Sequence, residues 1–309
     1  MKYAIVFPGQ GSQSLGMLSD LSSNFSIVKD IFSEASDALD LDLWKLVQED
    51  ENALNQTENT QPAMLAVGYA TYKVLSNETD LSPMCMAGHS LGEYTALVAA
   101  NSLDYFEAVK LVRKRAGLMQ SAVPSGTGAM AAILGLDDEK VIEICNQCNI
   151  AGVVEAVNFN SPGQVVIAGE NEAVNKACES MKEAGAKRAL LLPVSVPSHC
   201  SLMNNAAQEF SYSVDAVNFK MGETSVLHNV DASYADDANE IKLKLVEQLC
   251  KPVLWTSSVQ KMQQLGVEKL IELGPGKVLA GLTKRIDKSL SSLAVIDTAT
   301  VQSTIEEIS

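Results

Sequence analysis

The residues best suited to chemistry are a serine and its neighbours at 88–92, which read Gly-His-Ser-Leu-Gly. A short apolar run, MCMA, precedes this segment, and TALVAA, a run of small residues typical of a helix, follows it. A sharp strand-to-helix turn exposes a serine oxygen, and glycines leave room where the chain segments cross. The first N–H groups of the helix would face a negative charge that forms beside Ser90. The pattern predicts a nucleophilic serine, and a tight turn without catalysis is the alternative.

A serine nucleophile needs a general base, and the chain has three histidines. His89 is adjacent to Ser90, so its side chain should leave the turn in another direction, which indicates a packing or hydrogen-bonding role. His199 follows an expected domain junction, whereas His228 lies at an expected strand end. The junction favours His199 because sites form in clefts between domains. His228 stays possible, and the sequence assigns no Asp as a third member.

Arg115 is the clearest clue to the substrate. It shares one side of an expected helix with Ala108, Leu111 and Leu118, so it interrupts an apolar line. A partly buried guanidinium requires a carboxylate, and its planar fork suits bidentate binding of a carboxylate on a substrate. An internal ion pair with an Asp or Glu of the protein is the alternative.

A glycine-rich loop, FPGQGSQ, follows the first apolar run. Its glycines do not have the G-x-G-x-x-G spacing, and no GK[ST] follows, which argues against a nucleotide phosphate loop. At the carboxyl end of a first strand, such a loop can donate a second N–H to an oxyanion, and Gln10 is well placed for this. A plain turn before a helix is the alternative.

The elements that must position these residues alternate between strand and helix. Apolar runs at 3–7 and 84–87 are typical of strands, and periodic stretches predict helices at 25–50, 61–76, from Leu91, and at 104–121. This alternation predicts an α/β fold with a mainly parallel sheet.

Residues 125–195 contain a strand-helix-strand-strand-helix-strand series of their own, the order of a ferredoxin-like unit. Pro, Gly and Ser mark its entry and exit, and the α/β pattern resumes after it. The later elements are expected at 225–232, 238–250, 254–265, 269–273 and 274–286. We expect a discontinuous large domain of residues 1–124 and 196–309, a small inserted subdomain, and a site in the cleft between them.

Composition excludes several classes of function. The 309 residues carry 23 Lys and Arg against 38 Asp and Glu, a formal charge of −15, so nucleic acid is not an expected partner. The apolar run before Pro8 is too short for a signal peptide or a membrane span, which predicts a cytoplasmic protein that does not bind membranes. Cys145 and Cys148 have no second pair nearby, so we expect no metal site.

Several motifs follow one another in a specific order: FPGQGSQ, TQPAMLA, GHSLGEY, GTGAMAAILGL, NSPGQVVIAG, VPSHC and ELGPGKVLAGLTKRI. Through them the chain resembles the bacterial malonyl-CoA:acyl-carrier-protein transacylases of fatty-acid synthesis. The similarity covers nearly all of the chain, and only the last twenty or so residues are generic. The resemblance implies an α/β-hydrolase-like large domain with an inserted ferredoxin-like small subdomain.

The resemblance also implies catalytic roles. Ser90 would be the acylated nucleophile and His199 its general base, and the main-chain carbonyl of Gln248 would orient His199 in place of an acidic side chain. The backbone N–H groups of Gln10 and Leu91 would form the oxyanion hole.

For the substrate, the resemblance implies that Arg115 pairs with the free carboxylate of malonate. Gln61, Asn160 and His89 fall at positions that line the pocket. The tetrapeptide that ends at His199, VPSH, resembles that of the discrete malonyl-using enzymes.

The implied reaction is ping-pong transfer of malonyl from malonyl-CoA to Ser90 and then to the phosphopantetheine thiol of holo acyl carrier protein, without metal or redox cofactor. Carrier proteins of this pathway are acidic, so a basic patch must overcome the net charge of this chain. The candidates are Lys187, Arg188, Lys277, Lys284 and Arg285, and ordinary solvated side chains are the alternative. Three rival functions stay open: a serine esterase or thioesterase, a transacylase for another acyl group, and a non-catalytic carrier-binding module.

Overall fold

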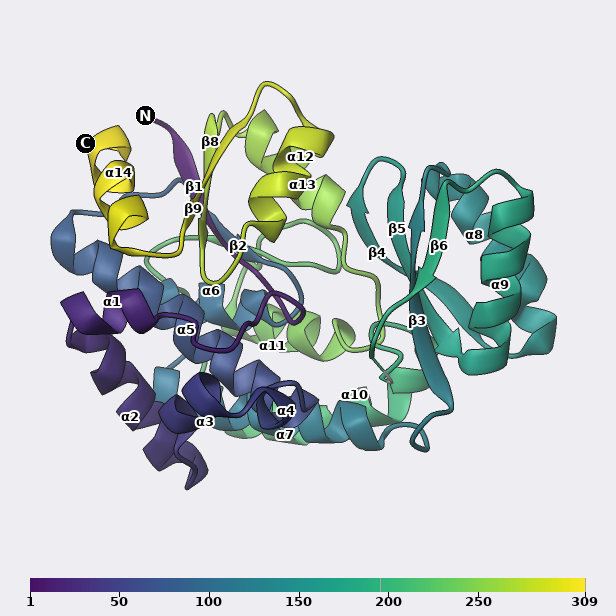
Figure 1. Ribbon diagram of the computed structural model, residues 1–309, viewed down its shortest axis with the longest axis horizontal. Coiled ribbons are helices and arrows are strands. Elements are labelled where there is room, and N and C mark those ends of the chain that lie inside the picture. The colour runs from purple at the N-terminus through teal and green to yellow at the C-terminus, as the bar shows by residue number, and fades with distance from the viewer. Residues whose placement is uncertain (195, 309) are drawn as a thin grey trace.

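Two sheets organise the computed structural model, which describes residues 1–194 and 196–308 (Figure 1). The strands are β1 (Tyr3–Phe7), β2 (Met86–Gly88), β3 (Gly128–Leu134), β4 (Val154–Ser161), β5 (Gln164–Glu170), β6 (Arg188–Leu191), β7 (Val226–Leu227), β8 (Lys269–Leu273) and β9 (Ser291–Val295). The helices are α1 (Ser19–Asn24), α2 (Ile27–Leu39), α3 (Leu43–Glu49), α4 (Glu51–Leu54), α5 (Thr57–Glu78), α6 (Gly92–Ala99), α7 (Tyr105–Ser121), α8 (Asp138–Cys148), α9 (Asn171–Glu183), α10 (Asn204–Ala216), α11 (Ala238–Glu247), α12 (Trp255–Gln264), α13 (Val278–Ile286) and α14 (Thr298–Ile308).

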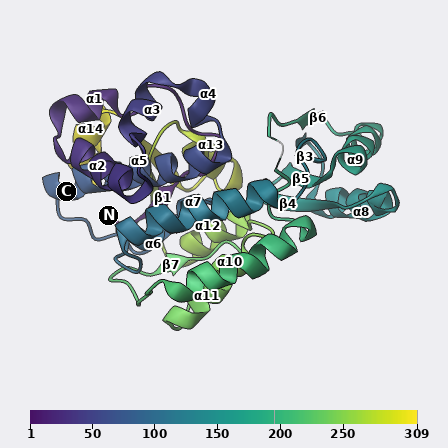
Figure 2. The ribbon, with the colours of Figure 1, turned by 90° about the horizontal axis from the view of Figure 1, so that it is seen from below.

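The larger sheet has the strand order β7-β2-β1-β8-β9, and every pairing in it is parallel. Its central strand β1 is fully buried because helices cover both faces. Side chains alternate along the strand, so Ile5 and Phe7 join a core with the helices on one face, while Ala4 and Val6 pack with α12 and α13 on the other. Figure 2 shows α7 running along this large part toward the small one.

The smaller sheet has the order β4-β5-β3-β6 and is antiparallel throughout. α8 and α9 pack on it and enclose a separate core around Ile133, Val141 and Val174. The chain order β3-α8-β4-β5-α9-β6 is the ferredoxin-like series that the sequence predicts. The expected fold class is therefore confirmed. The domain boundaries at 125 and 195 stay predictions, and residue 195 lies outside the described residues.

The small part is joined to the large part by backbone pairing as well as by the two chain crossings. The Phe159 N–H donates to the Val253 carbonyl at 3.0 Å, and the Val253 N–H donates to the Val157 carbonyl at 2.8 Å. The Thr256 hydroxyl adds a bond to the Phe159 carbonyl at 3.0 Å. These bonds hold the carboxyl-terminal half of β4 against the large part, beside the site described below.

Several elements differ from the sequence-based expectation. The helix expected at 25–50 is divided into α2 and α3, because Asp40 adopts a left-handed conformation with φ 50° and ends the first of them. The strand expected at 225–232 is only Val226–Leu227, since the chain turns away at His228. The helix α10 and the final pair β9 and α14 were not predicted.

Candidate active site

The nucleophile turn joins β2 to α6 and places Ser90 in a left-handed conformation with φ 52°. Close packing requires both glycines. A Cβ on Gly88 would lie 1.9 Å from the carbonyl carbon of Gly92, and a Cβ on Gly92 would lie 2.1 Å from the Phe7 carbonyl oxygen. The turn is therefore pressed between the end of β1 and its own helix, and the Ser90 side chain faces a cavity.

His199 lies next to the serine. The Ser90 hydroxyl donates to Nε2 of His199 at 2.8 Å, and Nδ1 of His199 donates to the Gln248 main-chain carbonyl at 2.6 Å. A carbonyl oxygen can only accept, so the proton is on Nδ1 and Nε2 is free to take the serine proton. The orienting acceptor is thus a backbone carbonyl, supplied by the residue that follows α11.

The other two histidines have different partners. His228 donates through Nδ1 to the buried Glu93 carboxylate at 2.8 Å. His89 contacts Asn160 Oδ1 at 2.8 Å through Nε2. The structure therefore brings His199, and not His228, to Ser90.

The environment of His199 keeps its imidazole neutral. Burial is the largest cause, and the nearby positive charge of Arg115 adds to it, so the pKa of His199 is lowered to about 3. The hydrogen bond to the Gln248 carbonyl acts in the opposite direction but is outweighed. Near neutral pH the ring can therefore accept a proton.

Arg115 lies in the same cavity and is 1% exposed. Its guanidinium donates to Gln61 Oε1 and to Gln248 Oε1, both at 2.9 Å, and to the Ser90 hydroxyl at 3.3 Å. Among the ion pairs of the described residues, none includes Arg115, so the internal ion pair that was the alternative is not found. Within the described residues, this buried cation has neutral oxygen atoms as hydrogen-bond acceptors, and the Tyr94 ring lies 5.4 Å from it. Such a cation suits a carboxylate from outside the protein.

A cavity of about 130 Å³ opens between the two parts of the chain and contains these groups. The large part contributes a set of polar side chains, and the small part and its exit contribute mainly apolar ones. The lining residues named by the sequence analysis are Gln10, Gln61, His89, Ser90, Leu91, Arg115 and His199. The cleft that the domain pattern predicts is therefore present.

Asn160 does not line this cavity, although the resemblance implied that it would. It lies behind the wall, bonded to His89, and Asn158 lines the cavity instead. The pairing of β4 with β5 is irregular between Ala156 and Asn158 and again between Phe159 and Ser161, so simple alternation along the strand does not give the facing. The sequence analysis took Asn160 from the family resemblance and made no prediction of which β4 side chains face the site, so it did not name Asn158.

The expected oxyanion donors border the nucleophile. The loop after β1 packs on the turn so closely that a Cβ on Gly9 would lie 2.5 Å from the His89 carbonyl oxygen. In the described part of the chain, no hydrogen bond from the backbone N–H of Gln10 or Leu91 is found. The Ser90 N–H, in contrast, is bonded within the protein to Asn229 Oδ1 at 2.7 Å.

Cys200 follows the candidate base but is unsuited to chemistry. It is fully buried, and its thiol contacts the Pro197 carbonyl at 3.1 Å. Burial raises the pKa of this thiol to about 12, so little thiolate forms near neutral pH.

Comparison with known proteins gives a consistent result. The model of the family described as "Acyl transferase domain" matches residues 4–304. A malonyl CoA-acyl carrier protein transacylase of Haemophilus influenzae is 54% identical over 300 residues, with 96% of each chain covered. The corresponding Escherichia coli K12 protein is 50% identical over 306 residues, with 99% of each covered.

Solved structures agree in fold. A malonyl-transacylase in complex with a type II PKS acyl-carrier protein superposes with a TM-score of 0.98 at 50% identity, covering 99% of this chain and 100% of that one. An acyl carrier protein S-malonyltransferase of Vibrio cholerae gives a TM-score of 0.96 at 53% identity, covering 98% and 100%. Across residues 1–194 and 196–308, no helix is both long and apolar enough to span a membrane.

Proposed function

The chain belongs to the acyl transferase domain family, and on this premise we propose that it moves a malonyl group from malonyl-CoA to the phosphopantetheine thiol of holo acyl carrier protein. It is an acyltransferase that supplies malonyl units to fatty-acid synthesis. One observation supports the malonyl assignment most directly: the buried Arg115, which has no carboxylate partner among residues 1–194 and 196–308, lies within hydrogen-bond distance of the candidate nucleophile.

In the first half-reaction, His199 accepts the Ser90 proton as the serine oxygen attacks the thioester carbonyl. The negative charge on the carbonyl oxygen is stabilised by the backbone N–H groups of Gln10 and Leu91. The tetrahedral intermediate then collapses, the carbon–sulfur bond breaks, and the CoA thiolate leaves with the proton from His199. A malonyl-serine ester and free CoA result.

The second half-reaction reverses these steps with a new thiol. The thiol of the carrier arm enters the same cavity, gives its proton to His199 and attacks the ester carbonyl. The carbon–oxygen bond of the ester breaks, Ser90 recovers its proton from His199, and malonyl leaves on the carrier protein.

Arg115 would select the acyl group. A malonyl carboxylate could form a bidentate pair with the guanidinium and replace the neutral partners Gln61 and Gln248 in part. An acetyl group offers no such pair and leaves the buried charge unmatched.

Each proposed step uses protein groups and the thioester only, so the proposal includes no metal ion or redox cofactor. A cytoplasmic location is also part of the proposal. Its test is fractionation of cells that express the chain, with a cytosolic and a membrane marker followed in parallel.

The test of the function is an intact-mass experiment. Incubation with malonyl-CoA alone should give one malonyl adduct on the peptide that contains Ser90, and holo carrier protein should then remove it and gain the same mass. A Ser90→Ala variant serves as the control and should stay unmodified. Release of free malonate at the turnover rate without carrier would identify a hydrolase instead, and intact malonyl-CoA with no adduct would exclude the transferase.

A further inference from the structure

The nucleophile turn is spanned from behind by a single side chain, that of Asn229. Its Oδ1 accepts the Ser90 N–H at 2.7 Å, and its Nδ2 donates to the Gly88 carbonyl at 2.7 Å. One end must accept and the other must donate, so the amide has a single orientation. Asn229 is 1% exposed and belongs to the segment after β7, far from the turn in sequence.

Glu93 supports this side chain from the first turn of α6. Its carboxylate accepts the backbone N–H of Asn229 at 2.9 Å, Nε2 of Gln248 at 2.8 Å and Nδ1 of His228 at 2.8 Å. Glu93 accepts all three of these bonds, so the NH₂ of the Gln248 amide faces Glu93. The amide oxygen is thereby left to face Arg115, at 2.9 Å.

Asn229 and Gln248 both form hydrogen bonds with the backbone of Ser90. Its N–H is bonded to Asn229, and its carbonyl accepts Nε2 of Gln248 at 3.0 Å. The carbonyl of Gln248 also orients His199. A left-handed serine persists only where its surroundings determine it fully, and these bonds are such surroundings.

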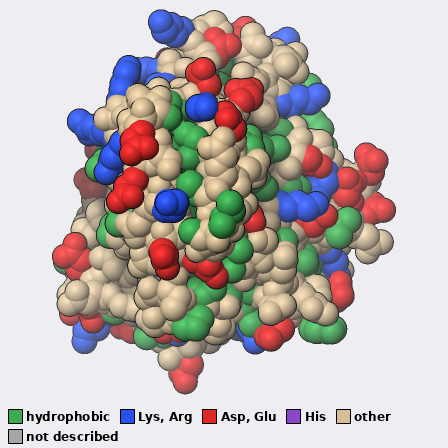
Figure 3. Space-filling view, turned by 90° about the vertical axis from the view of Figure 1, so that its right-hand side faces the viewer, with side chains coloured by type: hydrophobic (Ala, Val, Ile, Leu, Met, Phe, Trp, Pro, Cys, Tyr) green, Lys and Arg blue, Asp and Glu red, His purple; other side chains and the backbone are tan. Residues whose placement is uncertain are grey.

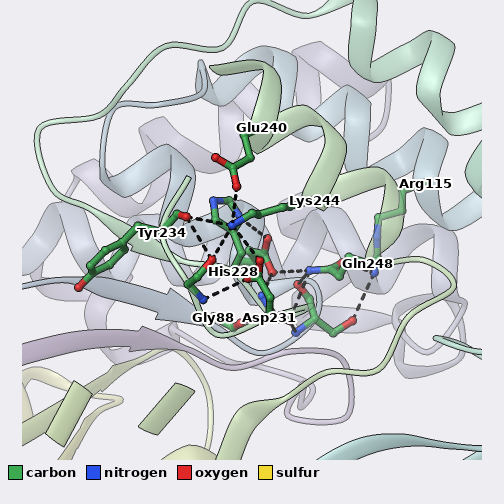
Figure 4. Close-up of polar contacts among 12 residues, drawn as sticks. Gly88, Arg115, His228, Asp231, Tyr234, Glu240, Lys244 and Gln248 are labelled. Atoms are coloured by element: carbon green, nitrogen blue, oxygen red, sulfur yellow. Dashed lines mark hydrogen bonds and ion pairs between the residues drawn. The ribbon is translucent and has the colours of Figure 1, made fainter. Parts of the chain in front are cut away.

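The segment that carries Asn229 is anchored at its far end as well. Lys244, one helical turn before Gln248, donates to the Ser233 hydroxyl at 2.7 Å and to the Tyr234 carbonyl at 2.9 Å. It also pairs with Asp231 at 3.0 Å. Figure 4 shows these contacts, with Gln248 between Arg115 and the rest of the network.

We propose that Asn229 is a positioning residue for acyl transfer and that Glu93 supports it. Asn229 holds the strained turn so that the Ser90 hydroxyl points to His199, and it occupies the Ser90 N–H so that the Leu91 N–H is the one left for the oxyanion. The proposal rests on the proposed function, because it requires Ser90 to be the acylated group.

The decisive variant is Asn229→Asp, which keeps the shape of the side chain. An ionised Asp cannot donate to the Gly88 carbonyl and lies beside Glu93, whereas a protonated Asp donates and accepts as Asn does. Burial and Glu93 would raise the pKa of the new carboxyl. Other charged or titratable groups of this network are His228 and Asp231 from the same segment, Lys244 from α11, Arg115 from α7 across Gln248, and His199 on the Gln248 carbonyl.

For Asn229→Asp we expect kcat to fall while KM stays the same, and we expect kcat to recover as the pH is lowered. At about pH 8, kcat should fall about 100-fold while KM for malonyl-CoA stays within about twofold, because the substrate contacts are unchanged. The ratio of variant to wild-type kcat should rise about tenfold between about pH 8 and about pH 5.5. A loss carried by KM, or a ratio that does not change with pH, would overturn the proposal.

Asn59→Asp is the matched control. Asn59 is also a buried amide that donates to a backbone carbonyl, that of Ala53 at 2.9 Å, and accepts from Arg113. The ratio of Asn59→Asp kcat to wild-type kcat should not change with pH. Wild-type protein in the same assay tests the proposed function separately: an adduct in the wild type together with a flat ratio for Asn229→Asp refutes only the positioning role.

Glu93→Gln is a second test of the positioning role, for the case that Asn229→Asp does not fold. It preserves volume but places an N–H among three donors, so kcat should fall about tenfold with KM within about twofold. Labelling of Ser90 by a fluorophosphonate should slow in parallel. Unchanged kcat and labelling would overturn the proposal.

Discussion

At the residue scale, the site depends on Gln248, which contacts both His199 and Arg115. Gln248 orients His199 through its carbonyl and holds Arg115 through its amide oxygen. The base and the cation that would select the substrate are therefore fixed by the same residue, although they come from distant parts of the chain. A change at Gln248 should consequently disturb both chemistry and selectivity.

Replacement of Arg115 should affect malonyl transfer and acetyl transfer to different extents. For Arg115→Ala, kcat/KM for malonyl-CoA should fall about 100-fold or more, since a buried charge pair is lost, while kcat/KM for acetyl-CoA should change by less than about fivefold. The control is Arg113→Ala on the same helix, whose side chain bonds the Glu58 carbonyl at the surface. Equal losses for both substrates would contradict malonyl selection by Arg115.

The lowered pKa of His199 predicts an unusual pH profile. An ordinary histidine gains a proton below about pH 6.5, but here the neutral form persists as pH falls, because the folded pKa is about 3. The acid limb of kcat/KM for Ser90 acylation should therefore lie below about pH 5. Rapid-quench mass spectrometry across the pH range measures it. A limb near pH 6.5 would show that burial and Arg115 do not control the base.

At the element scale, the strand-to-helix turn depends on two glycines at the crossing. Gly88→Ala should destabilise the protein by about 3 kcal/mol or more, because the new Cβ meets backbone that cannot move aside. Gly117→Ala on α7 is the control: nothing lies within 4 Å of its Cβ, and it should stabilise the helix by up to about 1 kcal/mol. Urea denaturation measures both, and similar values would contradict the packing argument.

Local patterns made this turn predictable, since its apolar run, glycines and following helix are adjacent in sequence. The helix α10 and the pair β9 and α14 were missed. For α14 the sequence does carry a local start signal, because Asp297 accepts the Thr300 N–H at 2.8 Å and the Thr300 hydroxyl accepts the Asp297 N–H at 2.9 Å. The terminal helix also has distant partners, such as Asp20, which accepts from the Thr298 N–H at 2.6 Å.

At the scale of the whole molecule, the fold class and the cleft followed from the order of elements, whereas the network behind the serine did not. Asn229 and Glu93 meet across a long stretch of chain, and no periodicity marks such a pair. The role expected for Gln248 came only from family resemblance, because a main-chain carbonyl leaves no signal in the residue type.

If the carrier protein is acidic, as the family resemblance implies, the net charge of this chain opposes their association. The chain carries −15, and Figure 3 shows basic side chains interspersed with acidic ones at the end formed by the small part. Charge reversal at Lys284 and Arg285 should raise KM for carrier protein about tenfold, with KM for malonyl-CoA unchanged. Because Arg285 also bonds Gln164 at 2.6 Å, Gln164→Ala is the control that removes the contact but keeps the charge. An unchanged KM for carrier would exclude this patch.

The backbone pairing of β4 with Val253 makes the joint between the two parts observable. The amide protons of Phe159 and Val253 are bonded across it, so they exchange with deuterated solvent when this pairing opens, as it must when the small part separates from the large one. Their protection factors would report the free energy of that opening directly. Slow exchange there would mean that the cleft keeps its width between turnovers, and that the thioester arm reaches the serine through an entrance already formed.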